Sequence, residues 1–166
     1  MTTYEQLRHR YKPINIRVLF VGESPPAGGT FFYKADSNLY HFTQRAFLDV
    51  FGVAFEDKRF LDSFKSIGCY LEDLCPRAIN KTNKAERKRH WVAGVESLTK
   101  CIRAAPPRAI VTVMRAIARH VNKAACKAGV DSTQIYSLPF PAFGHQQSYL
   151  VELKKVLNKL REDNKL

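Results

Sequence analysis

The sequence predicts an α/β fold of three layers, with a central, mostly parallel four-stranded sheet between two layers of helices. Short apolar, β-prone runs alternate with longer segments of helical spacing, and Pro- or Gly-rich loops follow some of these runs. Such alternation implies right-handed crossovers and a parallel sheet. At 166 residues, with no internal repeat or long linker, we expect one domain over 1–166.

The first strand gives the clearest signal. Residues 16–21 are nearly all apolar, as expected of a strand that is buried on both faces of a sheet. A short helix over 4–11 precedes it and ends before Pro13. The strand stops at Gly22, and residues 23–29 contain two prolines and two glycines, so they form a loop.

The later elements follow the same alternation. Apolar spacing predicts helices over 38–51, 57–64, 84–104, 114–128 and 145–161, and strands over 68–73, 108–113 and 134–138. Ligands of open parallel sheets bind beyond the carboxyl ends of the strands. The loops after Val21, Leu71 and Leu138 are therefore the candidate ligand loops.

Composition limits the classes of function. The 27 Lys and Arg residues against 15 Asp and Glu give a formal net charge of +12, which attracts polyanions such as nucleic acid. Solubility or an anionic membrane surface are the alternative explanations. No apolar stretch is long enough to cross a bilayer and the N-terminus does not resemble a signal peptide, so we expect a cytoplasmic protein without a membrane partner.

Neither a metal nor a cofactor is indicated. The four cysteines are widely spaced without a Cys-x-x-Cys pair, and we expect reduced, mostly buried thiols. The glycine patterns of phosphate-cradling loops are missing. We expect the chain to be a monomer.

Five segments carry motifs in order along nearly the whole chain. They are residues 18–26 (an apolar strand ending in Gly-Glu-Ser-Pro-Pro), the aromatic run 31–33, residues 70–77, residues 107–113, and Leu-Pro-Phe-Pro at 138–141. Together they are similar to the motifs of the uracil-DNA glycosylase superfamily. The resemblance implies the glycosylase fold and the removal of a base from DNA. The first motif is closest to the Gly-Glu-x-Pro branches, but the N-terminal cysteines that hold their iron-sulfur cluster are absent.

Three positions depart from the family pattern. Ser24, which we count among the candidate catalytic residues, stands where the commonest branch has an Asp that activates water. Asp73 replaces an Asn that reads uracil, and Leu138 replaces a His. The resemblance therefore implies the fold more directly than the activity or the target base.

Cleavage of an N-glycosidic bond produces a cationic sugar and an anionic base, so it needs a carboxylate near the sugar and a donor near the base. Glu23, beside Ser24, is the only acidic residue in the two Pro-rich loops and is the candidate for orienting water or stabilising the cation. A cap on loop amides is the alternative. His145, at the predicted start of the last helix, could supply the donor, or simply start that helix or contact a phosphate.

The base pocket is expected from four residues. The family places its stacking ring near Phe31, Phe32 and Tyr33, with Phe32 the best candidate, although these rings could also belong to the core. Asp73, when ionised, only accepts hydrogen bonds and favours a base that presents donors; uracil would require a protonated Asp73. Bracing of a loop is its alternative role.

The DNA-binding surface is expected from a basic run and from the loops. The candidates are Arg77, Lys81, Lys84, Arg87 and Lys88 for phosphates, in a run that extends to Arg89, with Pro25, Pro26, Pro139, Phe140 and Phe143 from the loops. A solvated helix face and core packing are the alternatives.

Three classes of function follow from these observations. A monofunctional DNA glycosylase comes first, and a non-catalytic DNA-binding relative with the same fold comes second. A nucleotide or nucleoside enzyme that uses the same crevice is third.

Overall fold

A four-stranded, all-parallel sheet lies at the centre of the computed structural model, which describes residues 3–79 and 81–166 apart from the Lys58 side chain. The strands are β1 (Val18–Gly22), β2 (Cys69–Asp73), β3 (Ala109–Thr112) and β4 (Ile135–Ser137), in the spatial order β2-β1-β3-β4. The predicted α/β class is confirmed, and the sheet is parallel throughout.

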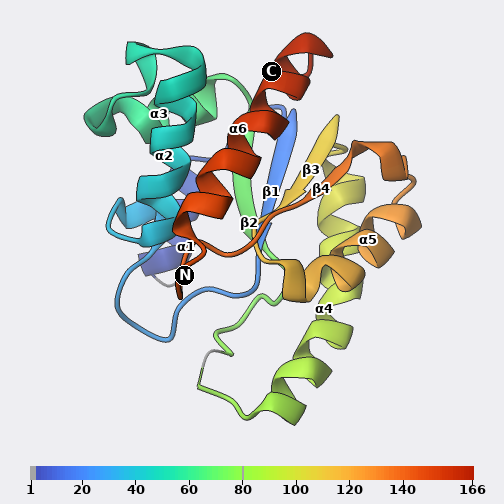
Figure 1. Cartoon of the computed structure of the whole chain (residues 1–166). Coiled ribbons are helices and arrows are strands. Elements are labelled where there is room, and N and C mark those ends of the chain that lie inside the picture. Colours follow the sequence, from blue (N-terminus) through green and yellow to red (C-terminus); the bar gives the residue numbers. More distant parts are fainter. Residues whose placement is uncertain (1–2, 80) are drawn as a thin grey trace.

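Helices cover both faces of the sheet (Figure 1). They are α1 (Thr3–Arg10), α2 (Asn38–Phe51), α3 (Phe60–Ser66), α4 (Lys84–Ala104), α5 (Ala118–Lys127) and α6 (Gln146–Glu162). Helices α2, α3 and α6 form one layer and α4 and α5 the other, with the first turns of α4 projecting beyond the sheet (Figure 1). No helix in the described part of the chain is long and apolar enough to cross a membrane.

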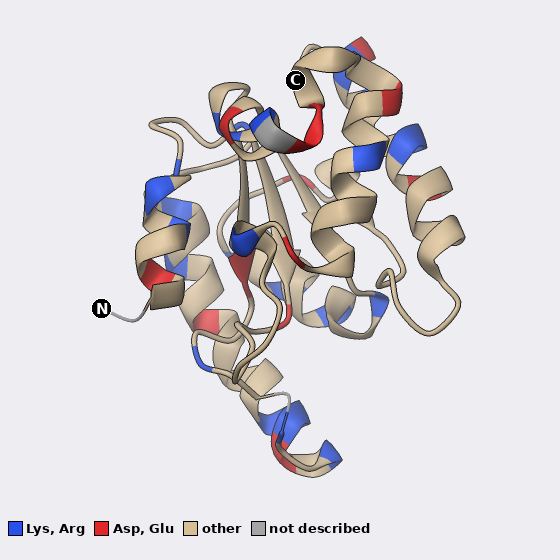
Figure 2. Ribbon diagram, turned by 90° about the vertical axis from the view of Figure 1, so that its left-hand side faces the viewer, with Lys and Arg blue, Asp and Glu red and all other residues tan. Residues whose placement is uncertain are grey.

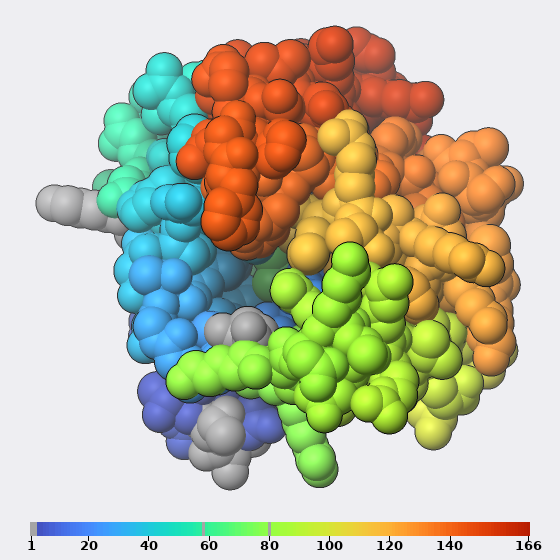
Figure 3. Space-filling model, turned by 60° about the horizontal axis from the view of Figure 1, so that its bottom comes forward, coloured from blue at the N-terminus to red at the C-terminus, as the bar shows by residue number. Residues whose placement is uncertain are grey.

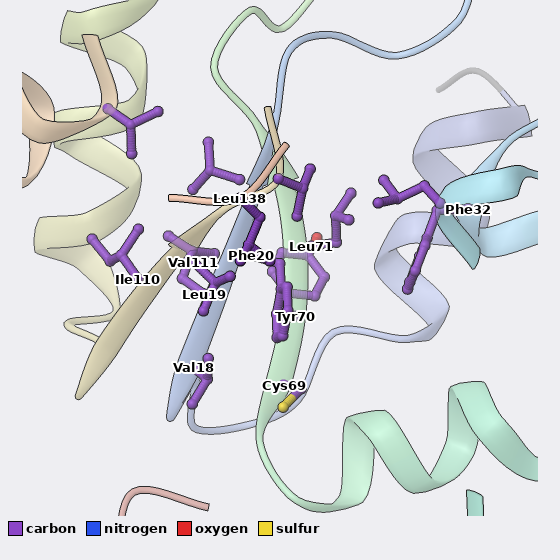
Figure 4. Packing of buried hydrophobic residues seen from close by; sticks show 14 of the residues in the cluster. Val18, Leu19, Phe20, Phe32, Cys69, Tyr70, Leu71, Ile110, Val111 and Leu138 are labelled. Carbon is purple, nitrogen blue, oxygen red and sulfur yellow. The ribbon is translucent and has the colours of Figure 1, made fainter. Parts of the chain in front are cut away.

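The two inner strands explain the continuous apolar runs in the sequence. All residues of β1 and β3 are buried, because each strand has a neighbour on both sides and helices over both faces. Figure 4 shows the apolar side chains of these strands packed closely together. The edge strand β4 is only partly buried.

Local chemistry fixes the helix boundaries. Ser37 accepts a hydrogen bond from the Tyr40 amide to begin α2, and Asn83 accepts one from the Glu86 amide to begin α4. Two predicted helices begin instead as 3-10 turns: 57–64 is a turn followed by α3, and 114–128 is a turn followed by α5.

Parallel pairing brings the predicted ligand loops to one edge. Gly22 lies opposite Asp73 at the carboxyl ends of β1 and β2. The pairing continues into the loops, where the Leu74 and Cys75 amides donate to the carbonyls of Gly22 and Glu23. The side chains that follow each strand are thereby held close together.

The cysteines agree with their predicted state only in part. All four are free thiols, and Cys69 and Cys75 are buried. Cys101 is half-buried and Cys126 is exposed, because it lies on the outer side of α5. The expectation of mostly buried thiols is therefore wrong for Cys126.

Candidate active site

A cavity of about 310 Å³ opens where the strands end. Its lining comes from the end of β1 and the loop after it (Gly22, Glu23, Ser24, Pro25, Pro26, Thr30), the following turn and α2 with its cap (Phe31, Phe32, Ser37, Leu39), the end of β2 (Leu71, Asp73), and Arg87, Met114, Phe140 and Phe143. Figure 3 looks onto this face, with a hollow between the blue, green, yellow and orange-red segments. Loops far apart in the sequence thus form one cavity, large enough for a nucleobase.

Glu23 is held by two side chains of α4. Arg87 donates through Nε to Oε1 (2.5 Å) and through Nη2 to Oε2, and the Trp91 indole nitrogen donates to Oε1 (2.7 Å). The Glu23 side chain is only 11% exposed. It therefore bonds side chains of α4 rather than capping loop amides, and its carboxylate is oriented at the cavity wall.

Asp73 is a buried carboxylate with a cation beside it. Arg8 of α1 binds Oδ2 of Asp73 through Nη2 and Oε1 of Glu72 through Nη1 (2.5 Å). Burial raises the pKa of Asp73 to about 6, although Arg8 opposes the shift; the nearby Glu72 carboxylate adds to it. The Asp73 carboxyl can therefore exchange a proton close to neutral pH.

Gly22 makes room for Asp73. A Cβ at position 22 would lie 2.5 Å from Oδ1 of Asp73, closer than atoms can approach without a shift. Gly22 and Asp73 both line the cavity. The glycine of the first motif thus lets the second strand deliver its carboxylate to the cavity.

The three aromatic residues after the glycines separate into two roles. Phe31 and Phe32 line the cavity, and Phe32 is packed edge-on against Tyr33 and Tyr40. Tyr33 is not among the lining residues: its hydroxyl both donates to the Leu71 carbonyl and accepts from the Leu71 amide. Its position favours the alternative of a core residue that anchors β2.

The loops present small and apolar groups at the mouth of the cavity. Ser24 lies in the lining, and its hydroxyl accepts a long hydrogen bond (3.4 Å) from the Ile79 amide. Phe143 is 96% exposed and Phe140 is 39% exposed. Pro139 is buried, so it supports this loop from within instead of facing a ligand.

His145 lies outside the cavity lining. It is exposed, directly precedes α6, and makes no side-chain cap. The structure favours the helix-start alternative over a donor to the departing base.

The residues of the predicted basic run lie at different hollows of the surface. Arg87 lines the cavity, and together with Lys84 and Lys88 it also lines a second hollow beside it. Arg77 borders another hollow, next to Arg8. Lys81 is exposed and lines none of these hollows. Figure 2 shows basic positions on the projecting end of α4.

Several residues of the site escaped prediction from the sequence, among them Arg8, Met114 and Trp91. Arg8 and Met114 gave no signal, because only the folded chain brings them to the strand ends. Trp91 could have been found: it follows Arg87 by four residues, so the two share one face of a helix.

Fold and cavity together define the class of protein: an open parallel α/β protein with its ligand site beyond the strand ends, lined by carboxylates and aromatic rings. Within the described residues, no group of three or more His, Cys, Asp or Glu side chains could hold a metal ion.

Comparison with known families is consistent with this class. Residues 9–161 match the family described as the Uracil DNA glycosylase superfamily. The chain therefore belongs to the uracil-DNA glycosylase superfamily, as the order of its motifs predicted. A search of curated proteins gave no match.

Proposed function

We propose that this protein is a monofunctional DNA glycosylase that extrudes one base from DNA into the cavity and hydrolyses its N-glycosidic bond. The observation that carries the proposal is the convergence of Glu23, Asp73, Phe31 and Phe32 on one cavity of about 310 Å³. Membership in the superfamily supports a glycosylase-like function in general.

The oriented Glu23 carboxylate suits the charge that develops on the sugar. The bond between C1′ and the base nitrogen breaks with its electron pair on the base, leaving a cationic sugar. A carboxylate stabilises that cation and orients the water that adds to C1′. The proton released by the water balances the charge on the departing base, so the products are an abasic site and a neutral free base.

The carboxyl group of Asp73 bears on the choice of base. Ionised, it only accepts hydrogen bonds and favours a base that presents an amino or ring N–H group. Protonated, it also donates, and it can then bind a carbonyl such as that of uracil. The pKa of Asp73 is about 6, so the protonated form increases as the pH falls through that value. Uracil is therefore expected to become a better substrate at lower pH, relative to bases that present donors.

A panel of oligonucleotides containing uracil, hypoxanthine, xanthine or alkylated bases tests the activity, because alkali cleaves the abasic product. Glu23→Gln should lower excision of the preferred base by on the order of 10² or more, since it removes the negative charge. Glu152→Gln is the matched control: it breaks another Arg–Glu pair, with Arg115 on the surface. Equal activity of both variants would contradict the role of Glu23.

The second candidate is a non-catalytic DNA-binding relative. It is favoured by one specific observation, the engagement of both Glu23 oxygens by Arg87 and Trp91. Tight binding of DNA without excision of any base in the panel would support it.

A further inference from the structure

Arg87 lies between two hollows. One is the cavity with Glu23 and Asp73. The other has a volume of about 370 Å³ and is lined by Thr82, Lys84, Arg87, Lys88, Trp91 and Met114. Arg87 and Met114 belong to both linings, so the two hollows are neighbours.

The second hollow has the chemistry of an anion site. Among the residues that the structure describes, its lining holds three cationic side chains and no acidic one. Lys84 and Lys88 are exposed and one helical turn apart, so both ammonium groups can turn toward a ligand there. The Thr82 hydroxyl, whose hydrogen goes to the Ile79 carbonyl, keeps lone pairs but no spare donor. Binding in this hollow therefore depends on the three cations.

Arg87 has donors left after it binds Glu23. A guanidinium carries five N–H groups in a planar fork. Nε and one Nη2 hydrogen are directed to Glu23, while the side chain is 35% exposed. The opposite edge, formed by Nη1 and the second Nη2 hydrogen, has the geometry for two oxygens of a phosphate.

The guanidinium is also held in place. Its central carbon lies 5.9 Å from the centre of the Trp91 ring, and Trp91 itself donates to Glu23. Each of the three side chains, Glu23, Trp91 and Arg87, therefore contacts the other two. An anion bound to the outer edge of Arg87 is coupled through the same group to the carboxylate of Glu23.

We propose that the hollow of Lys84, Arg87 and Lys88 binds a backbone phosphodiester of DNA, and that Arg87 bridges this phosphate to Glu23. The inference rests on the proposed function only in taking DNA as the ligand. Arg87 is a positioning residue in this arrangement. It couples a phosphate bound at one edge of its guanidinium to the Glu23 carboxylate bound at the other edge.

The test measures binding of a short undamaged oligodeoxynucleotide by fluorescence anisotropy at several salt concentrations. Lys84→Ala with Lys88→Ala should weaken binding more than the control pair Lys100→Ala with Lys155→Ala. Each lost phosphate contact should also lower the slope of log affinity against log salt by about one. Both pairs lie at exposed positions and remove the same charge, so equal effects would overturn the phosphate site.

The bridge is tested separately. Glu23→Gln removes the negative charge that the other edge of Arg87 neutralises, so the cation is left to the phosphate. The same oligonucleotide should therefore bind several-fold more tightly to Glu23→Gln than to Glu152→Gln. Arg87→Lys should abolish this gain, because an ammonium lacks the two-edged fork. A gain that persists in Arg87→Lys, or no gain in Glu23→Gln, would overturn the bridge.

Inorganic phosphate distinguishes the source of the anion. If inorganic phosphate displaces the oligonucleotide from the wild type when its concentration equals that of the DNA phosphate groups, the hollow binds free phosphate and the assignment to DNA is wrong. Weak competition is the expected result. Because undamaged DNA is never cleaved here, the outcome is independent of whether the protein excises a base.

Discussion

At the scale of single residues, the site depends on two carboxylates in different surroundings. Glu23 is oriented by donors from α4, whereas Asp73 is buried beside Arg8 and Glu72. The sequence indicated both carboxylates, because Glu23 follows the first predicted strand and Asp73 ends the second. It could not indicate Arg8, which lies 65 residues from Asp73 in the sequence.

Replacement of Arg8 tests the surroundings of Asp73. In Arg8→Met, the pKa of Asp73 should rise above about 6, because the carboxylate loses the cation that opposes its burial. Carbon-13 NMR titration of the labelled carboxyl measures it, with Arg10→Met on the exposed side of α1 as the control. A fall in the pKa of Asp73 would contradict this electrostatic picture.

The same shift has a consequence for stability. Because the pKa of Asp73 in the folded state lies above its ordinary value of 3.8, the folded state binds the proton more tightly than the unfolded state does. The contribution of Asp73 to stability is therefore fully present below pH 3.8 and is lost as the pH rises through about 6.

At the scale of elements, the strands and long helices could be predicted well from the sequence. The apolar run of β1 and the spacing in α2 and α4 are strong local signals, and both helices have the predicted bounds. The 3-10 turns before α3 and α5 were not predicted, because short turns depend on how the chain packs rather than on periodicity. The roles of Tyr33 and Pro139 likewise depend on burial.

Gly94 shows how closely α4 approaches the end of β2. A Cβ there would lie 2.4 Å from the backbone oxygen of Leu74. Gly94→Ala should therefore destabilise the protein by about 1–3 kcal/mol, although alanine favours helices. Chemical denaturation measures the difference in the free energy of unfolding between this variant and the wild type.

The exposed neighbouring residue provides the control for this prediction. Ala93→Gly should cost about 1 kcal/mol from helix propensity alone. If Gly94→Ala stabilised the fold, the close contact between α4 and the end of β2 would be refuted.

At the scale of the whole molecule, part of the basic charge lies beside the cavity. The net charge of +12 predicts attraction to a polyanion. The first turns of α4 carry basic residues (Figure 2), and Lys84, Arg87 and Lys88 line the hollow next to the cavity. The exposed Phe143 lies at the cavity as well. The single domain, the monomeric state and the cytoplasmic location stay predictions.

The proposed function requires that one extruded base occupies the cavity between the strand ends. A crystal structure of Glu23→Gln with an oligonucleotide carrying the preferred base, or the abasic product with free base, tests it most directly. We expect one base inside the cavity, stacked on Phe31 or Phe32 and bonded to Asp73, with a phosphate at Arg87. A complex in which every base stays stacked, or in which DNA lies on another face of the protein, would contradict the claim.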